Sequence, residues 1–271
     1  MRFLRVLVLV PLCATGCATY SIRRAALTPN PAPVTRDGQP MASPFEIAVG
    51  TASLARVSAP QTGDDPNEGL VVPRFDLNGG IRARIGRNFD VGFLFDNGFN
   101  GGAEMTAPDM PRPSGDVTGY GVSVHGSLGE GDFRVGLELD ALVYDIPWTE
   151  TWTCVDDCGS DPEPLTHVRS GHAQTGVVAL GVIPSWRVGP WVLFGSATAR
   201  NHPTIAKGSV QKIEIDDPVD AGPVNLVVAA GAELMLAGGA RVAMQAYLPL
   251  SNDPVKYAPT LAASLIMGFG P

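Results

Sequence analysis

Residues 71–85 decide the fold class, and they read VVPRFDLNGGIRARI. Apolar side chains occupy odd positions of this stretch, from Val71 to Ile85, whereas charged side chains such as Asp76 and Arg82 occupy even positions. Successive side chains of a β-strand point to opposite faces, so this alternation predicts a strand with one apolar face and one charged face.

Ten stretches of the chain follow the same period-two pattern, and helical periodicity is hard to find. The ten predicted strands are 45–57, 70–86, 88–98, 117–129, 132–147, 173–188, 190–202, 223–237, 240–250 and 259–270. Short links marked by Gly alternate along the chain with long links rich in Pro, Asp and Gly, at 58–69, 99–116, 148–172 and 203–222.

Regular alternation of short and long links is typical of outer-membrane β-barrels, which have short periplasmic turns and long external loops. The sequence therefore predicts an all-β, antiparallel, up-and-down β-barrel of about ten strands. An even strand count also predicts that the N- and C-termini both lie in the periplasm. The alternative is a soluble periplasmic β-domain that binds a ligand, because the strands of a sandwich alternate as well.

Composition agrees with a membrane barrel and excludes one partner class. Charged residues make up only 17% of the 271 residues, below the usual quarter of soluble domains. The formal net charge is −8, and no basic cluster follows Arg23 and Arg24, so we expect no nucleic-acid partner.

The first residues have the layout of a signal peptide, with two arginines, a short apolar core and small residues after it. The sequence Ala14-Thr15-Gly16-Cys17 resembles a bacterial lipobox. This resemblance implies removal of residues 1–16, attachment of lipid such as palmitate to Cys17, and a lipoprotein held in the membrane. The alternative is conventional cleavage, for instance after Ala18. Residues 17–43 are then predicted to be the lipid anchor and a flexible tether, because they are rich in Pro, and residues 44–271 the barrel domain.

The charged faces of the predicted strands define an interior polar network. In a narrow barrel these groups are expected to neutralise one another and fill the interior, rather than to line an open pore. No ring of a single sign suggests ion selection. The predicted network is Arg74, Asp76, Arg82, Arg84, Asp90, Arg134, Glu138, Asp140, Glu233 and Arg241.

One catalytic arrangement is conceivable. His125 and Ser127 share a face of one strand, and Glu138 on the neighbouring strand could orient the imidazole, as in serine hydrolases. The pair resembles that of a family of outer-membrane lipid A deacylases, and the resemblance covers two residues. The other interpretation, which we favour, is an interior hydrogen-bond network.

The predicted external loops carry further candidates. Cys154 and Cys158 are expected to form a disulfide that stiffens the longest loop. The predicted barrel architecture also resembles the omptin-like surface proteases, although no motif matches residue by residue. Carboxylates in these loops could bind divalent cations or bridge lipopolysaccharide, next to His167, His172 and His202. These carboxylates are Asp156, Asp157, Asp161, Asp216 and Asp217.

The sequence contains no cofactor motif and no metal signature. We therefore expect a non-enzymatic protein of the cell envelope, with a structural, surface-interaction or narrow-passage role and outer-membrane lipids as its partners. A membrane-embedded hydrolase that uses His125 and Ser127, and a soluble periplasmic ligand-binding domain, remain the alternatives.

Overall fold

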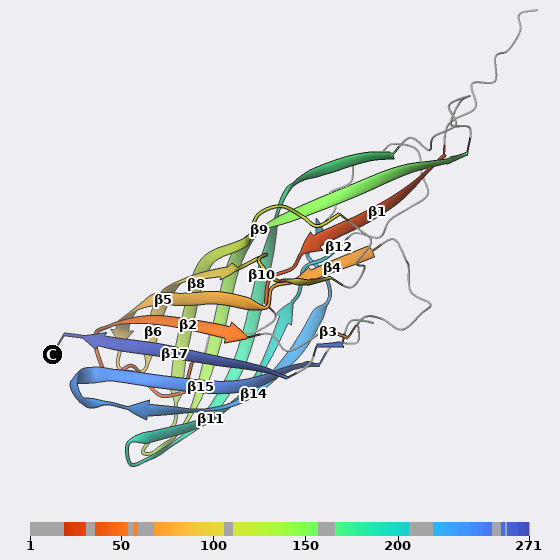
Figure 1. The fold of residues 1–271 in the computed structure, drawn as a ribbon. Coiled ribbons are helices and arrows are strands. Elements are labelled where there is room, and N and C mark those ends of the chain that lie inside the picture. The colour runs from red at the N-terminus through yellow and green to blue at the C-terminus, as the bar shows by residue number, and fades with distance from the viewer. Residues whose placement is uncertain are drawn as a thin grey trace, which may run out of the picture.

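A computed structural model describes residues 19–30, 36–53, 57–58, 68–105, 111–156, 166–205, 219–250, 256–257 and 259–270 (Figure 1). In this part of the chain, ten antiparallel strands form a closed barrel, because β9 pairs with β10 and joins the two ends of the strand order. The ten are β2 (Phe45–Ser53), β5 (Phe75–Gly86), β6 (Phe89–Gly98), β8 (Val117–Leu128), β9 (Phe133–Asp156), β10 (Thr166–Val188), β11 (Trp191–Asn201), β14 (Val224–Met235), β15 (Ala240–Leu250) and β17 (Thr260–Phe269). The predicted fold class is confirmed.

Four tight connections lie at one end of the barrel, which we call the short-turn end. They join β5 to β6, β8 to β9, β10 to β11, and β14 to β15 through the short 3-10 helix η1 (Ala237–Gly239). Gly189 has a φ of 61° in the β10–β11 turn, a conformation that glycine adopts without steric cost. The strand ends that the longer connections join lie at the opposite end, which we call the long-loop end. Among the described residues, no helix is long and apolar enough to cross a membrane.

Two strands are longer than the sequence predicts. β9 has 24 residues and β10 has 23, and the two pair with each other as far as Thr153 and Thr166. Residues 148–153 and 166–172 were expected to be loop, but they contain several Thr and Trp residues, which favour strands. The long-loop end therefore carries a β9–β10 ribbon that projects beyond the other strands (Figure 1).

The segment before the barrel is not a flexible tether where the structure describes it. β1 (Thr19–Leu27) pairs antiparallel with the ribbon part of β9, from Trp148 to Asp156. On its other side β1 pairs parallel with β4 (Glu68–Val72), which pairs with β7 (Glu104–Met105). Two-residue strands form two further small pairs: β3 (Val57–Ser58) with β16 (Lys256–Tyr257), and β12 (Thr204–Ile205) with β13 (Val219–Asp220).

Between β1 and β2, residues 28–30 and 36–41 lie inside the barrel. We call residues 28–30 and 36–41 the lumen segment. Most of its described residues are buried, and they contact inward-facing side chains of the wall. The segment ends beside Phe45, which pairs with Phe269 at the short-turn end.

The two described ends of the chain consequently lie at opposite ends of the barrel. Thr19, the first described residue, is paired with Asp156 at the tip of the ribbon, whereas Phe269 lies at the short-turn end. The side of the membrane on which each terminus of the chain lies stays a prediction. An even number of strands brings the end of β17 back to the level at which β2 begins, and the described residues 36–41 before β2 lie in the lumen.

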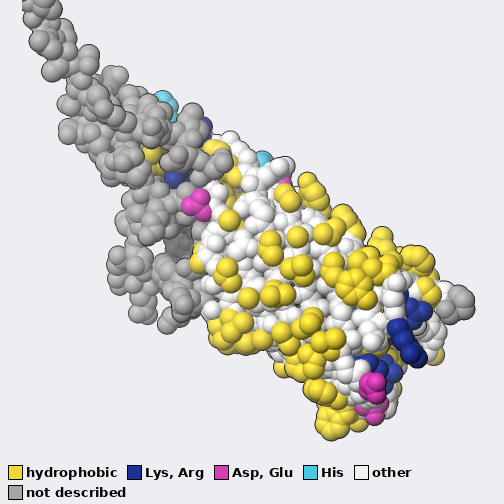
Figure 2. Space-filling view, turned by 180° about the vertical axis from the view of Figure 1, so that it is seen from behind, with side chains coloured by type: hydrophobic (Ala, Val, Ile, Leu, Met, Phe, Trp, Pro, Cys, Tyr) yellow, Lys and Arg dark blue, Asp and Glu magenta, His cyan; other side chains and the backbone are white. Residues whose placement is uncertain are grey.

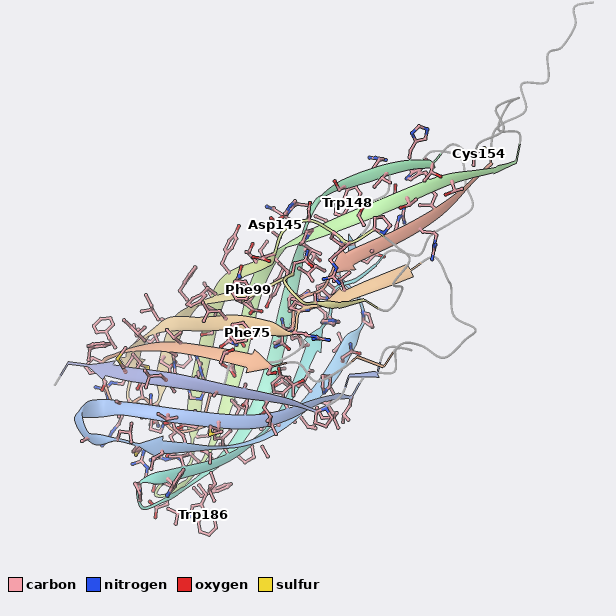
Figure 3. All side chains as sticks on the ribbon, viewed as in Figure 1. Phe75, Phe99, Asp145, Trp148, Cys154 and Trp186 are labelled. Carbon is pink, nitrogen blue, oxygen red and sulfur yellow. The ribbon has the colours of Figure 1, made fainter. Side chains whose placement is uncertain are left out.

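The outer wall of the barrel is apolar. Exposed hydrophobic side chains cover the barrel wall, and charged side chains gather at the short-turn end (Figure 2). Exposed aromatic side chains form a ring at the short-turn end, namely Phe45, Phe89, Phe133, Trp186, Trp191 and Phe269. Near the long-loop end, Phe75 stacks on Phe99 with ring centroids 5.8 Å apart (Figure 3).

Candidate functional site

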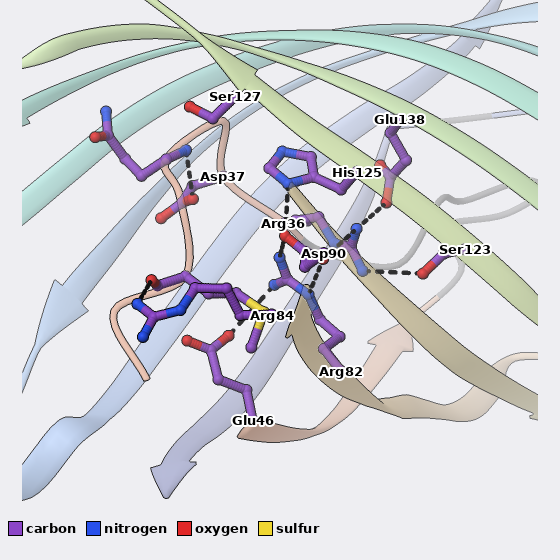
Figure 4. A network of polar contacts seen from close by, with 12 residues as sticks. Arg36, Asp37, Glu46, Arg82, Arg84, Asp90, Ser123, His125, Ser127 and Glu138 are labelled. Atoms are coloured by element: carbon purple, nitrogen blue, oxygen red, sulfur yellow. Dashed lines mark hydrogen bonds and ion pairs between the residues drawn. The ribbon is translucent and has the colours of Figure 1, made fainter. Parts of the chain in front are cut away.

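The most densely charged part of the interior lies in the half of the barrel nearer the short-turn end. We call it the charged cluster, and its members come from seven barrel strands and the lumen segment. Figure 4 shows the members on β2, β5, β6, β8 and β9 together with Arg36 and Asp37. All members are buried. Those on strands face inward because they occupy the polar positions of the alternating pattern. The charged cluster consists of Arg36, Asp37, Glu46, Arg82, Asp90, His125, Glu138, Glu233 and Arg241.

Asp90 is the centre of the charged cluster. Arg82 donates two hydrogen bonds to its carboxylate, from Nε to Oδ1 at 3.1 Å and from Nη2 to Oδ2 at 3.0 Å. His125 Nδ1 lies 3.0 Å from Asp90 Oδ2, and Arg36 Nη1 lies 3.8 Å from Oδ1. A bidentate guanidinium pair of this kind is among the strongest polar contacts in proteins, so Asp90 joins three elements firmly.

Arg36 connects the lumen segment to the wall. Its Nη1 lies 3.1 Å from Glu138 Oε1 on β9, and its Nη2 donates a hydrogen bond of 3.2 Å to Ser123 Oγ on β8. The side chain of Arg36 is 3% exposed. A buried guanidinium that lost these partners would be strongly destabilising, so Arg36 fixes the position of the segment.

Arg241 closes the other side of the charged cluster. Its Nη2 lies 2.5 Å from Glu46 Oε2, and its Nη1 lies 2.9 Å from Glu233 Oε1 and 3.9 Å from Asp37 Oδ2. Arg82 Nη1 reaches the same Glu46 oxygen at 3.4 Å. The ion pairs therefore form one connected network that spans the lumen from β9 to β15 and includes the segment.

Hydrogen bonds and a close backbone contact also hold the lumen segment. Ser127 Oγ donates a hydrogen bond of 2.8 Å to Gly38 O, and Gln39 Nε2 donates one of 3.0 Å to Ser185 Oγ. A Cβ atom on Gly38 would lie 2.1 Å from Ile183 O and 2.7 Å from Gly136 N. No side chain fits there, so glycine is required for the backbone to touch the wall.

A second polar group lies nearer the long-loop end. Asn30 of the lumen segment donates a hydrogen bond of 2.5 Å to Asp76 Oδ2 and accepts one of 3.0 Å from Tyr247 OH. Beside them, Arg200 Nη2 donates to Tyr144 OH at 2.9 Å, and Tyr144 OH donates to Asp96 Oδ2 at 2.8 Å. Both ends of the lumen segment are thus bound to polar groups of the wall.

Above this group, toward the long-loop end, lies an apolar layer. Ala25, Ala26 and Leu27 of β1 pack against Val71 of β4 and against barrel residues such as Ile146 of β9. Leu27 and Ile146 are fully buried. The N-terminal part of the chain therefore contributes to two layers of contacts inside the barrel, an apolar one made with β1 and a charged one made with Arg36.

The predicted interior network is largely found in the lumen. Asp76, Arg82, Asp90, Glu138, Asp140, Glu233 and Arg241 are buried there. Arg74 and Arg84 are exposed and Arg134 is half-buried. The last two flank short turns, where a strand has left the barrel interior: Arg84 donates a hydrogen bond to Met41 O at 3.1 Å, and Arg134 donates one to Gly129 O.

The sequence did not reveal that the lumen segment contributes to the site. Three residues of this segment lie outside the predicted strands, namely Arg36, Asp37 and Gln39. The period-two pattern predicts which face of a strand a side chain lies on, and it does not apply to a segment that is not a strand. One signal was present: between Ala25 and Phe45, Arg36 and Asp37 are the only charged residues. An isolated charge pair in an otherwise uncharged stretch is a reason to look for buried partners.

The candidate catalytic residues do not form a triad. His125 pairs with Asp90 and not with Glu138, and Glu138 pairs with Arg36. Ser127 donates its hydrogen bond to the lumen segment, and in the described part of the chain no hydrogen bond joins it to His125. Both side chains are almost completely buried, at 0% and 1% exposure. This geometry matches an interior hydrogen-bond network.

Most of the loop candidates lie outside the described residues, namely Cys158, Asp157, Asp161, Asp216 and Asp217. Cys17 lies outside them as well. Cys154 is described and buried near the tip of β9 (Figure 3), and its pairing with Cys158 stays a prediction. His172 Nδ1 lies 2.9 Å from Asp145 Oδ2 in an exposed pair, and His167 is exposed as well.

His202 differs from these exposed histidines, because it is buried just after β11. Burial, helped by the nearby Arg200 guanidinium, lowers the pKa of His202 to about 3, so this imidazole is neutral at physiological pH. Among the described residues, no group of three or more His, Cys, Asp or Glu side chains is placed to hold a metal ion.

Comparisons with known proteins give similarity in structure only. No family model matches the chain, and no curated protein matches it in sequence. An outer membrane channel from Pseudomonas putida F1 is 10% identical, with 89% of this chain and 100% of that chain covered and a TM-score of 0.46. LpxR from Salmonella typhimurium is 9% identical over 83% and 100% of the chains, with a TM-score of 0.42. The outer membrane protease OmpT from Escherichia coli is 10% identical over 93% and 97%, with a TM-score of 0.36. No activity is carried over from them.

The close approach of Gly38 to the wall can be tested by adding one methyl group. Gly38→Ala is expected to destabilise the folded barrel by about 1–3 kcal/mol, because the methyl group would overlap backbone atoms that cannot move aside. Urea unfolding of the protein in lipid vesicles measures this change. The matched control is Gly101→Ala, where a Cβ has no neighbour within 4 Å. Equal effects of the two changes would show that Gly38 does not touch the wall.

Proposed function

We propose that the chain is an outer-membrane β-barrel whose lumen is closed by its own N-terminal segment, with a non-catalytic role as a narrow passage that is normally shut. The observation that carries the proposal is the lumen segment, which is bound through Arg36 inside a barrel with an apolar outer wall. The segment fills the space that a ten-stranded barrel leaves between its side chains.

The outer wall supports the membrane location. On β10, the outward-facing residues from Val178 to Val188 are apolar, with Val178, Val182 and Trp186 between 44% and 59% exposed. This run is about as long as the ten residues with which a tilted strand crosses a membrane. Toward the ribbon the outward face becomes polar at Gln174, His172 and Ser170. A soluble domain would leave this apolar surface in water, which disfavours the periplasmic ligand-binding alternative.

The orientation that follows places the long-loop end outside the cell, as in other barrels of this kind. Outer-membrane lipids are then the partners of the apolar wall, and lipopolysaccharide or divalent cations could meet the acidic loops. Thr19 is at the long-loop end. Cys17 lies outside the described residues, and a lipid on it stays a prediction.

The hydrolase alternative has less support. Reaction at Ser127 needs a substrate beside its hydroxyl, but that hydroxyl faces Gly38 O inside the lumen. Its neighbour His125 is held by Asp90, away from any surface that lipid could reach. The pair could act only after the lumen segment had left.

The apolar wall predicts a depth-dependent response to charge. Val182→Arg is expected to destabilise the membrane-inserted barrel by about 2–4 kcal/mol, because Val182 lies near the middle of the apolar run. Gln174→Arg, on the same face of the same strand but beyond the apolar run, is the control and should change the stability little. Urea unfolding in lipid vesicles measures both. An equal and small effect of the two changes would contradict a membrane position for this wall.

Closure of the lumen predicts a specific pattern of conductance. Leu27→Asn places an amide in the apolar layer, and Gly38→Val forces the segment from the wall beside the charged cluster. The two closures are in series, so each single variant leaves the other in place. We expect no steady conductance in planar bilayers from the wild-type protein or either single variant, and an open channel from the double variant.

Two controls make this measurement decisive. Each protein is first shown to migrate faster on a denaturing gel when unboiled, so that loss of conductance is not loss of folding. The control Gly101→Ala should behave as wild type. A wild-type protein that conducts steadily would contradict closure by the segment, and a folded double variant that does not conduct would contradict the passage.

A further inference from the structure

The wall of the lumen carries an excess of negative charge. Among the described residues of the ten barrel strands below the ribbon, seven carboxylate side chains are buried and three guanidinium side chains are buried. The formal excess is therefore four negative charges. The carboxylates are Glu46, Asp76, Asp90, Asp96, Glu138, Asp140 and Glu233, and the guanidiniums are Arg82, Arg200 and Arg241.

The lumen segment already places a cationic group in this acidic lumen. Arg36 lies between Glu138 and Asp90, at 3.1 Å and 3.8 Å, although it belongs to none of the strands. The guanidinium is attached to the segment and leaves when the segment leaves. Glu138 would then have lost Arg36 as its ion-pair partner, and hydrated cations entering the lumen are the nearest replacement.

Further buried carboxylate oxygens face the lumen without a hydrogen-bond donor. In the described part of the chain, Asp140 Oδ1 and Glu233 Oε2 have no hydrogen-bond partner, and these residues are 4% and 1% exposed. They come from β9 and β14, which are separated by β10 and β11 in the barrel. Acceptor oxygens without donors favour a cation and disfavour an anion.

We infer that the passage, once the lumen segment is displaced, is selective for small cations. This inference rests on the proposed function, since it concerns the same lumen. The inference differs from the expectation from sequence, in which the wall carried similar numbers of positive and negative side chains. Three arginines that were predicted to lie inside the barrel are not buried there, namely Arg74, Arg84 and Arg134. Without them, the buried carboxylates of the wall outnumber its buried guanidiniums.

The test uses the double variant Leu27→Asn with Gly38→Val, which changes no charge. Its reversal potential is measured in a planar bilayer under a KCl gradient. We expect the sign that K⁺ dictates, with a permeability ratio of K⁺ to Cl⁻ severalfold above one. Adding Asp140→Asn and Glu233→Gln should bring the ratio severalfold closer to one. The matched control adds Asp132→Asn, an exposed carboxylate in the β8–β9 turn, and should leave the ratio nearly unchanged.

The possible failures are distinguishable. A folded double variant without conductance overturns the proposed passage and the inference with it. An open channel that prefers Cl⁻, or that has no preference, overturns the cation inference and leaves the passage standing. An unchanged ratio after Asp140→Asn with Glu233→Gln would also count against the inference, because it would show that these carboxylates do not act on the ions.

Discussion

The structure depends on one electrostatic constraint, which is that charged groups inside the barrel must be paired because they are shielded from bulk water. Removing a carboxylate or a guanidinium from water costs several kcal/mol, and only close partners offset this cost. Asp90 meets the constraint with Arg82, His125 and Arg36 together. Because one of these partners belongs to the lumen segment, the position of the segment and the stability of the charged wall are linked.

The same constraint explains why a chain segment occupies the lumen. Side chains alone fill the interior of an eight-stranded barrel, and a barrel of ten strands encloses a wider interior. The segment fills it with backbone at Gly38, where no side chain fits, and with polar side chains elsewhere. Its contacts near the charged cluster are mainly polar, whereas β1 closes the long-loop end with small apolar residues. Because the lumen is closed by polar contacts in one layer and by apolar contacts in another, two different substitutions are needed to open it.

Much of the barrel could be predicted from the sequence, since each strand alternates between a membrane-compatible and a polar face. The ten predicted strands correspond to the ten strands of the barrel, and Asp90 and Glu138 were correctly assigned to the interior. The ribbon and β1 were not predicted, because strands that pair beyond the barrel do not show a regular alternation of apolar and polar residues. Arg36 was missed for a stronger reason: the interactions that place it are made with residues of distant strands, Glu138 and Ser123.

The most direct test of the account is a cross-link between the lumen segment and the wall. Gln39 Nε2 and Ser185 Oγ are 3.0 Å apart inside the barrel. In a protein carrying Gln39→Cys and Ser185→Cys, a short reagent that joins two thiols through disulfide bonds, such as a bis-methanethiosulfonate, should produce a reductant-sensitive change in gel mobility that neither single variant shows. Efficient cross-linking of the folded, membrane-inserted protein is the result that the account predicts. A folded protein in which the two cysteines react separately and never cross-link would contradict it, because the N-terminal segment would then lie outside the lumen.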